Sequence, residues 1–381
     1  MQRSYFDNNA TTPLDPEVLA AMLPYLAEQF GNPSSNHRFG EVARSGVEQA
    51  RQQVARLVNC PPRQVIFTGG GTEANNMAVA SGAAASGKRH LITSTVEHPS
   101  VLAPLRHLAG HGFELTVLEV DDDGGLPPSR LAAAIRPDTA LVSLMAANNE
   151  SGVIWPVEEY GALCRQRGVL FHTDAIQYAG KMAIDMQRLP VDYLTVAAHK
   201  LHGPKGCGAL CFARTAPVVP VLRGAGQEFG LRPGTENVAA IAGFGIAAEL
   251  AARQLDDFAA QTGSLRDLLE NEVAGRLAGV RINGRGQMRL PNTSNLSFSG
   301  VAGAALVQEL DEQGFAVSAH SACHGGDLDP SHVLVAMRVP EEFIHGTLRI
   351  SFSRNTRRAE VEGFIELLVR LVGKSRATAA L

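Results

Sequence analysis

The segment Thr195-Val196-Ala197-Ala198-His199-Lys200 is a β-rich run that ends in a lone lysine, followed by the loop Leu201-His202-Gly203-Pro204-Lys205-Gly206. A lysine amine attacks a carbonyl only when its surroundings favour the neutral amine, which burial and neighbouring cations do. A lysine on an exposed helix face meets neither condition. The position of Lys200 is therefore typical of a lysine kept for covalent chemistry.

An acid occupies a similar place earlier in the chain. Val169-Leu170-Phe171-His172-Thr173-Asp174 reads as a buried strand that ends in a carboxylate. Asp174 and Lys200 at the ends of successive strands suit pyridoxal phosphate (PLP), because a lysine holds its aldehyde as a Schiff base and a carboxylate keeps its ring nitrogen protonated. The spacing alone fits equally well an ordinary buried aspartate and a lysine whose ammonium group reaches solvent.

A glycine turn offers a place for the phosphate. The stretch Val65-Ile66-Phe67-Thr68-Gly69-Gly70-Gly71-Thr72-Glu73-Ala74-Asn75-Asn76 reads as a strand, a glycine turn and then a helix. Glycines let the backbone approach an anion, and a helix N-terminus presents free N–H groups to it. The spacing matches neither the dinucleotide-binding G-x-G-x-x-G nor the P-loop pattern. Together with Asp174 and Lys200, the turn favours the PLP interpretation.

The succession of elements predicts an α/β fold. Apolar β-branched runs at 65–67, 141–145 and 170–172 alternate with helical patterns such as 41–58. Runs that are apolar on both faces indicate a mostly parallel sheet covered by helices, with ligands at the carboxyl ends of the strands. A long helical stretch at 236–279 predicts a hinge, and the shorter strands beyond it predict a smaller α+β domain.

Short motifs spread over nearly the whole chain carry a family resemblance. The chain resembles the NifS/IscS-type (group I) cysteine desulfurases of the class V aminotransferase family, which have PLP fold type I. The matching motifs are Asp7-Asn8-Asn9-Ala10-Thr11-Thr12, Gly31-Asn32-Pro33-Ser34-Ser35, Val96-Glu97-His98-Pro99, Asn148-Asn149-Glu150, Phe171-His172-Thr173-Asp174-Ala175, His199-Lys200, Gly203-Pro204-Lys205-Gly206, Gly234-Thr235-Glu236-Asn237, Ser321-Ala322-Cys323 and Leu348-Arg349-Ile350-Ser351.

The resemblance implies a domain organisation. A large PLP-binding domain would span residues 15–257, and a small domain carrying the catalytic cysteine loop would combine 1–14 with 258–381. The family is obligately dimeric with its active site at the subunit boundary. Thr235 and the segment around His37 are the residues expected to cross to the other subunit.

The resemblance also implies the roles of the site residues. Lys200 would form the Schiff base and act in catalysis, Asp174 would pair with the ring nitrogen, and His98 would stack on the ring as a further catalytic residue. The other expected cofactor ligands are Gln177 on the ring hydroxyl, Gly71, Thr72, His199 and Thr235 at the phosphate, and Asn149. Asn149 and Arg349 are expected to bind the substrate carboxylate, and Asn8 is expected to be a third substrate ligand.

Cys323 is the predicted nucleophile. Its surroundings, Ala319-His320-Ser321-Ala322-Cys323-His324-Gly325-Gly326-Asp327, have the small and polar composition of a mobile loop. A thiolate there would take the sulfur of L-cysteine as a persulfide, and neighbouring histidines could lower its pKa if they are cationic. His320 and His324 stand where relatives commonly have smaller residues, so one of them is a candidate to tune Cys323. No permanent metal site is expected, with Cys323 as a transient iron–sulfur ligand at most.

Cys60, Cys164, Cys207 and Cys211 are predicted to be packing thiols, although a redox role for Cys207 or Cys211 stays open. The odd number of cysteines and the absence of a C-x-x-C pair argue against a disulfide framework and a structural zinc site.

Composition favours a cytoplasmic enzyme. The 381 residues carry a formal net charge of −4 and no polybasic stretch, which argues against direct nucleic-acid binding. No apolar run reaches membrane-spanning length, and the N-terminal residues lead straight into a family motif, which argues against a signal peptide. We therefore expect a cytoplasmic homodimer that acts on L-cysteine without binding nucleic acid or a membrane.

Other functions stay open from the sequence. A selenocysteine lyase or an aminotransferase could use the same fold, but an aminotransferase has no use for Cys323. A sulfur-relay scaffold that acts mainly by binding proteins would keep its function without Lys200. A Rossmann-type oxidoreductase is disfavoured by the missing G-x-G-x-x-G. The sulfur acceptor, an iron–sulfur scaffold or a thio-modification enzyme, cannot be named from the sequence.

Overall fold

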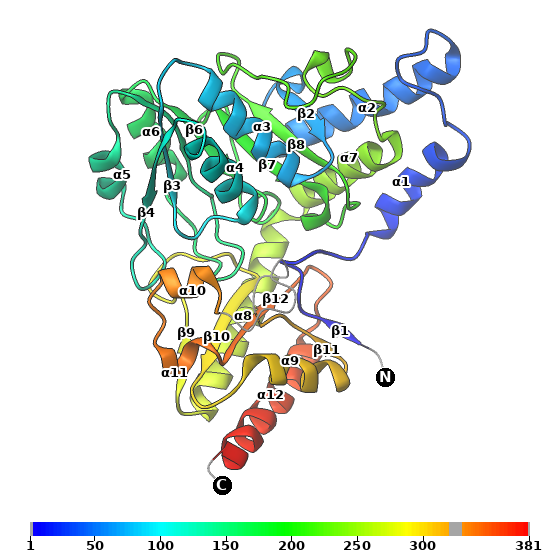
Figure 1. Ribbon diagram of the computed structural model, residues 1–381. Helices are drawn as coiled ribbons and strands as arrows, with labels where there is room; N and C mark the ends of the chain where they lie inside the picture. The colour runs from blue at the N-terminus through cyan, green and yellow to red at the C-terminus, as the bar shows by residue number, and fades with distance from the viewer. Residues whose placement is uncertain (1–2, 320–329, 380–381) are drawn as a thin grey trace.

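A seven-stranded sheet forms the centre of the larger part of the molecule (Figure 1). The computed structural model describes residues 3–319 and 330–379. Neighbouring strands are parallel except for β8, which is antiparallel to both β2 and β7. In sheet order the strands are β2 (Val65–Thr68), β8 (Gly208–Phe212), β7 (Tyr193–Ala197), β6 (Leu170–Asp174), β5 (Thr139–Ser143), β3 (His90–Ser94) and β4 (Glu114–Leu118).

Helices cover both faces of this sheet. Successive side chains of a strand point to opposite faces of the sheet. On β5, Val142 therefore packs into the hydrophobic cluster on one face and Leu141 into the cluster on the opposite face. The α/β class and the mostly parallel sheet predicted from the sequence are confirmed. The helices of this part are α1 (Pro16–Ala27), α2 (Arg38–Leu57), α3 (Gly71–Ala84), α4 (Pro99–Ala109), α5 (Pro128–Ala134), α6 (Val157–Gln166) and α7 (Val238–Arg253), with short 3₁₀ turns η1 (Pro62–Gln64), η2 (Ala198–Lys200) and η3 (Glu228–Gly230).

A second core lies around a three-stranded sheet in the smaller part, where β10 (Thr293–Phe298) runs antiparallel to β9 (Val280–Ile282) and to β12 (Thr347–Ser351). The N-terminal β1 (Ser4–Tyr5) pairs in parallel with β11 (Phe315–Ala316) at this end of the molecule (Figure 1). The helices here are α8 (Leu255–Arg276), α9 (Gly303–Glu312), α10 (His332–Ala336), α11 (Glu341–Ile344) and α12 (Arg358–Ala379).

Helices α7 and α8 join the two parts and meet at a bend of 71°. The predicted domain boundary between residues 257 and 258 lies in the first turn of α8, and both this boundary and the hinge stay predictions. Within the described residues, no single helix is long and apolar enough to cross a membrane, and only the bent α7–α8 pair reaches that length and composition together.

The strand order gathers several loops at one edge of the large sheet. The strands β2, β3, β5, β6 and β7 run in the same direction, so their carboxyl ends lie together. This edge is where an open α/β sheet binds its ligands. The segments that leave it carry Thr72, His98, Asn149, Gln177 and Lys200.

His172 joins three strands inside the large sheet. The ring of this fully buried histidine on β6 bonds through Nδ1 to Ser143 Oγ on β5 (2.8 Å) and through Nε2 to Thr195 Oγ1 on β7 (3.2 Å). Burial lowers the pKa of His172 to about 3. The ring is therefore neutral in the folded protein at ordinary pH.

We expect His172 to make stability depend on pH. The unfolded chain binds a proton at the ordinary histidine pKa of about 6.5, whereas the folded chain does not, so the free energy of unfolding falls as pH drops from about 6.5 towards 3. Urea unfolding at several pH values measures this dependence. His172→Asn should reduce the change of the unfolding free energy with pH by up to about 1.4 kcal/mol per pH unit, the effect of one bound proton. The exposed His107→Asn is the control, and an unchanged slope in His172→Asn would contradict the assignment.

Candidate functional site

A cavity of about 240 Å³ opens at this edge of the sheet. It brings together most of the predicted site residues from segments far apart in the chain. Those that line it are Gly71, Thr72, His98, Asn149, Asp174, Gln177, His199, Lys200 and Arg349, together with Asn9, Ala10, Ser100, Met145, Ala147 and Ile176.

Lys200 reaches the cavity directly from β7. All five residues of that strand are buried, and the short η2 turn then carries Lys200 out at the carboxyl end. Its Nζ donates to the backbone carbonyls of Ala10 (2.7 Å) and Asn9 (2.5 Å). The amine is thus held at the cavity wall by the N-terminal segment.

The carboxylate of Asp174 is fixed from both sides. Oδ2 accepts a hydrogen bond from Asn75 Nδ2 (2.7 Å), and Oδ1 accepts one from the backbone N–H of Ile176 (3.0 Å). The side chain is 7% exposed. A buried carboxylate held in this way can pair with a protonated ring nitrogen, because charge-assisted bonds are strongest where water is excluded.

His98 is connected to Asp174 through two polar side chains. Asn75 Nδ2 also donates to Ser100 Oγ (2.9 Å), and Ser100 Oγ lies 2.7 Å from His98 Nδ1. The backbone N–H of Ser100 donates to the same Nδ1 (3.1 Å), so the ring proton of neutral His98 sits on Nε2. Burial lowers the pKa of His98, opposed by the Asp174 carboxylate and reinforced by Lys200. His98 is therefore a neutral ring with a defined tautomer.

The glycine turn allows close approach of the backbone at the N-terminus of α3. A Cβ on Gly71 would lie 2.2 Å from Ile176 Cδ1, and Gly70 has a φ of 148° that side chains rarely adopt. Gly71 and Thr72 line the cavity, so the free N–H groups of the helix start can face an anion. His199 stands nearby, and burial followed by the charges of Lys200 and Lys205 lowers its pKa to about 4.

Arg349 brings a positive charge from the small sheet. The side chain is 2% exposed, its Nη2 pairs with Asp7 Oδ1 (2.7 Å), and its Nη1 donates to the carbonyl of Asn149 (3.3 Å). Among residues 3–319 and 330–379, none is a hydrogen-bond partner of its Nε. A buried guanidinium N–H without a partner beside a cavity fits the binding of a carboxylate, since arginine binds carboxylates through two parallel N–H groups.

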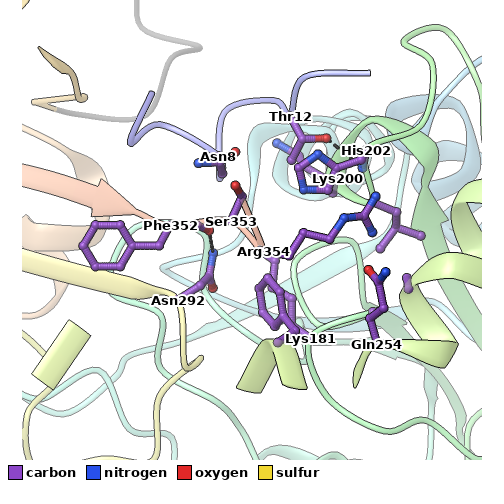
Figure 2. Close-up of a pocket in the computed structure, with 14 residues that line it drawn as sticks. Asn8, Thr12, Lys181, Lys200, His202, Gln254, Asn292, Phe352, Ser353 and Arg354 are labelled. Atoms are coloured by element: carbon purple, nitrogen blue, oxygen red, sulfur yellow. Dashed lines mark hydrogen bonds between the residues drawn. The ribbon is translucent and has the colours of Figure 1, made fainter. Parts of the chain in front are cut away.

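Two predicted residues lie outside this cavity. Asn8 faces a neighbouring small cavity, in which Figure 2 shows it with Lys181, Lys200 and Arg354, and its Nδ2 donates to the carbonyls of Tyr5 and Ser351. Thr235 lines a separate cavity beside Arg232 and Cys207. Within one chain neither residue lines the cavity of about 240 Å³ that holds Asp174 and Arg349, and their roles at substrate and phosphate stay predictions.

Cys323, His320 and His324 lie outside the described residues. The four cysteines that the structure does describe are buried, and none of them lines the cavity of Lys200. Burial raises the pKa of Cys164 and of Cys207 to about 12, and a hydrogen bond to Cys60 together with burial raises that of Cys211. Thiols of this kind are poor nucleophiles, because the thiolate is the reactive form.

Sequence reasoning missed several residues that build the site. Asn9, Asn75, Ser100 and Lys181 all contribute hydrogen bonds around the cavity. Asn9 and Asn75 stood inside stretches that were singled out, but their partners lie far away in the chain. Only the folded structure shows which groups they meet.

Comparisons with known proteins agree with this geometry. The family model of the aminotransferase class-V family matches residues 4–364. The chain belongs to the class-V aminotransferase family. Cysteine desulfurase IscS of Dictyoglomus turgidum is 44% identical over 375 residues, which cover 98% of this chain and 95% of that protein. A cysteine desulfurase of Enterobacter agglomerans is 43% identical over 378 residues, covering 99% and 94%.

Solved structures of the family have the same fold. A NifS-like protein superposes with a TM-score of 0.92 at 36% identity, covering 98% of this chain and 100% of that one. A NifS-like protein from Rickettsia africae has a TM-score of 0.87 at 30% identity, covering 98% and 100%. The NifS/IscS-type resemblance read from the sequence is confirmed.

Enzymes of this family use PLP, and the residues of the cavity fit that cofactor. Lys200 offers an amine for its aldehyde, Asp174 a fixed carboxylate for its ring nitrogen, and the start of α3 a set of N–H groups for its phosphate. Over the described residues, no group of three or more His, Cys, Asp or Glu side chains could hold a metal ion.

We expect Ser100 to control the protonation of His98. Ser100→Ala removes the hydroxyl at Nδ1, so the neutral ring loses a donor and the pKa of His98 should rise by up to about one unit, the equivalent of one net hydrogen bond. Titration of ¹⁵N-labelled histidine rings by NMR, with His98→Gln for assignment, measures this shift. Ser100→Thr keeps a hydroxyl and should titrate like the parent protein; an unmoved His98 in Ser100→Ala would refute the assignment.

Proposed function

We propose that this protein is a PLP-dependent cysteine desulfurase that converts L-cysteine into L-alanine and keeps the sulfur as a persulfide on Cys323. The observation that carries the proposal is one cavity in which Lys200, Asp174 and Arg349 meet from three separate elements. Relatives named cysteine desulfurase, similar along nearly the whole chain, support it.

In this proposal Arg349 and Asn149 bind the substrate. The Nε–H of the buried guanidinium has no partner within the part of the chain that the structure describes. The guanidinium's bond to the Asn149 carbonyl holds the two residues together at the cavity wall. A carboxylate of L-cysteine on Arg349 would direct the amino group towards Lys200. The Asp7 carboxylate keeps the arginine oriented.

Lys200 and Asp174 serve the chemistry at the α-carbon. When bound, PLP supplies an electron sink for the electrons released there. Two N–H donors hold the Asp174 carboxyl group in place for the ring nitrogen. Lys200 holds the amine that takes the α-proton and returns a proton to the carbon skeleton.

Cys323 completes the reaction as sulfur acceptor. Its thiolate attacks the sulfur of the substrate, so that an S–S bond forms and the C–S bond of the substrate breaks. The electron pair of the C–S bond stays with the carbon fragment, which is protonated and leaves as L-alanine. The balance is L-cysteine plus enzyme thiol giving L-alanine plus enzyme persulfide, and the enzyme is then a sulfurtransferase towards a protein acceptor.

The assembly in which this happens is proposed to be a cytoplasmic homodimer. Helix α1, the loop after it and the start of α2 expose large apolar side chains that are unusual on the surface of a monomer: Leu19, Leu23, Leu26, Phe30 and Phe39. These residues support burial against a second copy, and Thr235 would then serve the neighbouring phosphate site. The sulfur acceptor is an iron–sulfur scaffold or a thio-modification enzyme; direct contact with nucleic acid or a membrane is not proposed.

Turnover of L-cysteine tests the proposal. Purified protein with PLP and a thiol reductant should release sulfide and alanine in equal amounts. Cys323→Ala should abolish both products while it keeps the yellow colour of the bound cofactor, and Cys60→Ala is the matched control that should retain them. A yellow protein that leaves L-cysteine intact would point to selenocysteine or amino-group transfer. Sulfur transfer that survives Lys200→Ala would point to a scaffold.

Arg349→Lys should weaken the use of substrate. Lysine keeps the charge but cannot make two parallel bonds to a carboxylate. Loss of a hydrogen bond to a charged group costs about 1.5 to 3 kcal/mol, so kcat/KM for L-cysteine should fall roughly 10- to 100-fold. Steady-state kinetics measure this, with Arg370→Lys on α12 as the control. An unchanged kcat/KM would remove Arg349 from the substrate site.

A further inference from the structure

Lys181 is a buried lysine that the proposed chemistry does not use. It lies just after the Gly180 turn that follows β6 and is 4% exposed. Its Nζ donates to Gln177 Oε1 (2.7 Å) and to Asn9 Oδ1 (3.1 Å). Among the residues that the structure describes, no carboxylate pairs with it. A buried lysine that bonds only to amide oxygens is costly unless its position serves a purpose.

The bonds of Lys181 form a closed ring with Gln177 and Asn9. Gln177 Nε2 donates to the backbone carbonyl of Asn9 (2.8 Å), while its Oε1 accepts from Lys181. If the amide of Gln177 were flipped, its oxygen would face the Asn9 carbonyl, which is repulsive, and the hydrogen bond that Lys181 donates to Oε1 would be lost. Lys181 and the carbonyl of Asn9 therefore allow one orientation of this amide.

That orientation matters because Gln177 lines the cavity of Lys200. An amide nitrogen has two N–H groups. One N–H of Gln177 is used by Asn9, and the second is left to donate to a ligand. With the amide reversed, the cavity would meet an acceptor oxygen in its place.

The surroundings of Lys181 favour its neutral amine over the charged ammonium. Burial, followed by the positive charges of Lys200 and Arg349, lowers the pKa of Lys181 well below its usual value. On its other side the small cavity of Figure 2 adds Arg354 and His202, and Arg354 is already paired with an aspartate. A neutral amine still has the two N–H donors that Asn9 and Gln177 use.

We propose that Lys181 is a positioning residue that locks the amide of Gln177 with its NH₂ group towards the cavity, so that Gln177 donates to the phenolic oxygen of bound PLP. The inference rests on the proposed function for the cofactor and adds a residue that acts through another. Lys181 itself does not touch the cofactor.

A double-mutant cycle in the full-length protein loaded with PLP tests the link. A donor to the phenolic oxygen stabilises its negative charge and weakens its hold on the proton of the neighbouring imine nitrogen. Loss of that donor should raise the pH midpoint of the visible absorption band by up to about one unit and increase the Kd for PLP by up to roughly tenfold. Lys181→Met and Gln177→Leu should give similar shifts, and the double variant should give no larger one.

The outcomes separate the possible roles. Additive shifts in the double variant would mean that Lys181 acts independently of Gln177 and would overturn the proposal. The proposal would also be overturned if Gln177→Leu shifts the pH midpoint of the absorption band and Lys181→Met does not. Lys374→Met, on the surface of α12, controls for loss of a lysine as such. If Lys181→Met does not fold, Lys181→Gln is the test: it keeps an N–H donor and should leave the midpoint near that of the parent protein, and a shift as large as that of Gln177→Leu would overturn the proposal. A parent protein without any visible band would contradict the proposed function itself, and the inference with it.

Discussion

One buried residue, Asn9, holds the two parts of the molecule together at the cavity. Its backbone carbonyl accepts from Lys200 Nζ (2.5 Å) and from Gln177 Nε2 (2.8 Å) at the edge of the large sheet. Its backbone N–H donates to Ser351 Oγ and its Nδ2 donates to Thr293 Oγ1, both in the small sheet. A buried polar group with every partner in place specifies one arrangement, since any displacement leaves donors unpaired. The position of Lys200 relative to Arg349 depends on this junction.

Burial then decides which groups around the cavity carry charge. It lowers the pKa values of His98 and His199, so these rings are neutral, and it raises that of Glu97 to about 8, so this acid is protonated at neutral pH. The carboxyl group of Asp174 accepts hydrogen bonds from two N–H donors. The charged groups that remain around the cavity can pair with oppositely charged groups of a cofactor and of an amino acid. The same fold therefore supplies both the shape and the electrostatics of the site.

Much of this was readable from the sequence, because the signals were local. The strand before Lys200, the strand ending in Asp174 and the glycine turn each show in a few residues, and parallel strands place their ends at one edge. The hydrogen bonds of Asn9, Ser100 and Lys181 were not readable, since they depend on which distant segments meet and on the direction of each amide. The predicted role of Thr235 requires a second subunit, which the structure of a single chain does not contain.

The most direct measurement is the covalent attachment of PLP. Protein reconstituted with PLP is reduced with borohydride, digested and analysed by mass spectrometry, with Lys200→Ala treated in parallel. The account predicts one pyridoxyl adduct on the peptide containing Lys200 and none in the variant. An adduct on another lysine, or a protein that forms none, would contradict the central claim that the cavity around Lys200 is a PLP site.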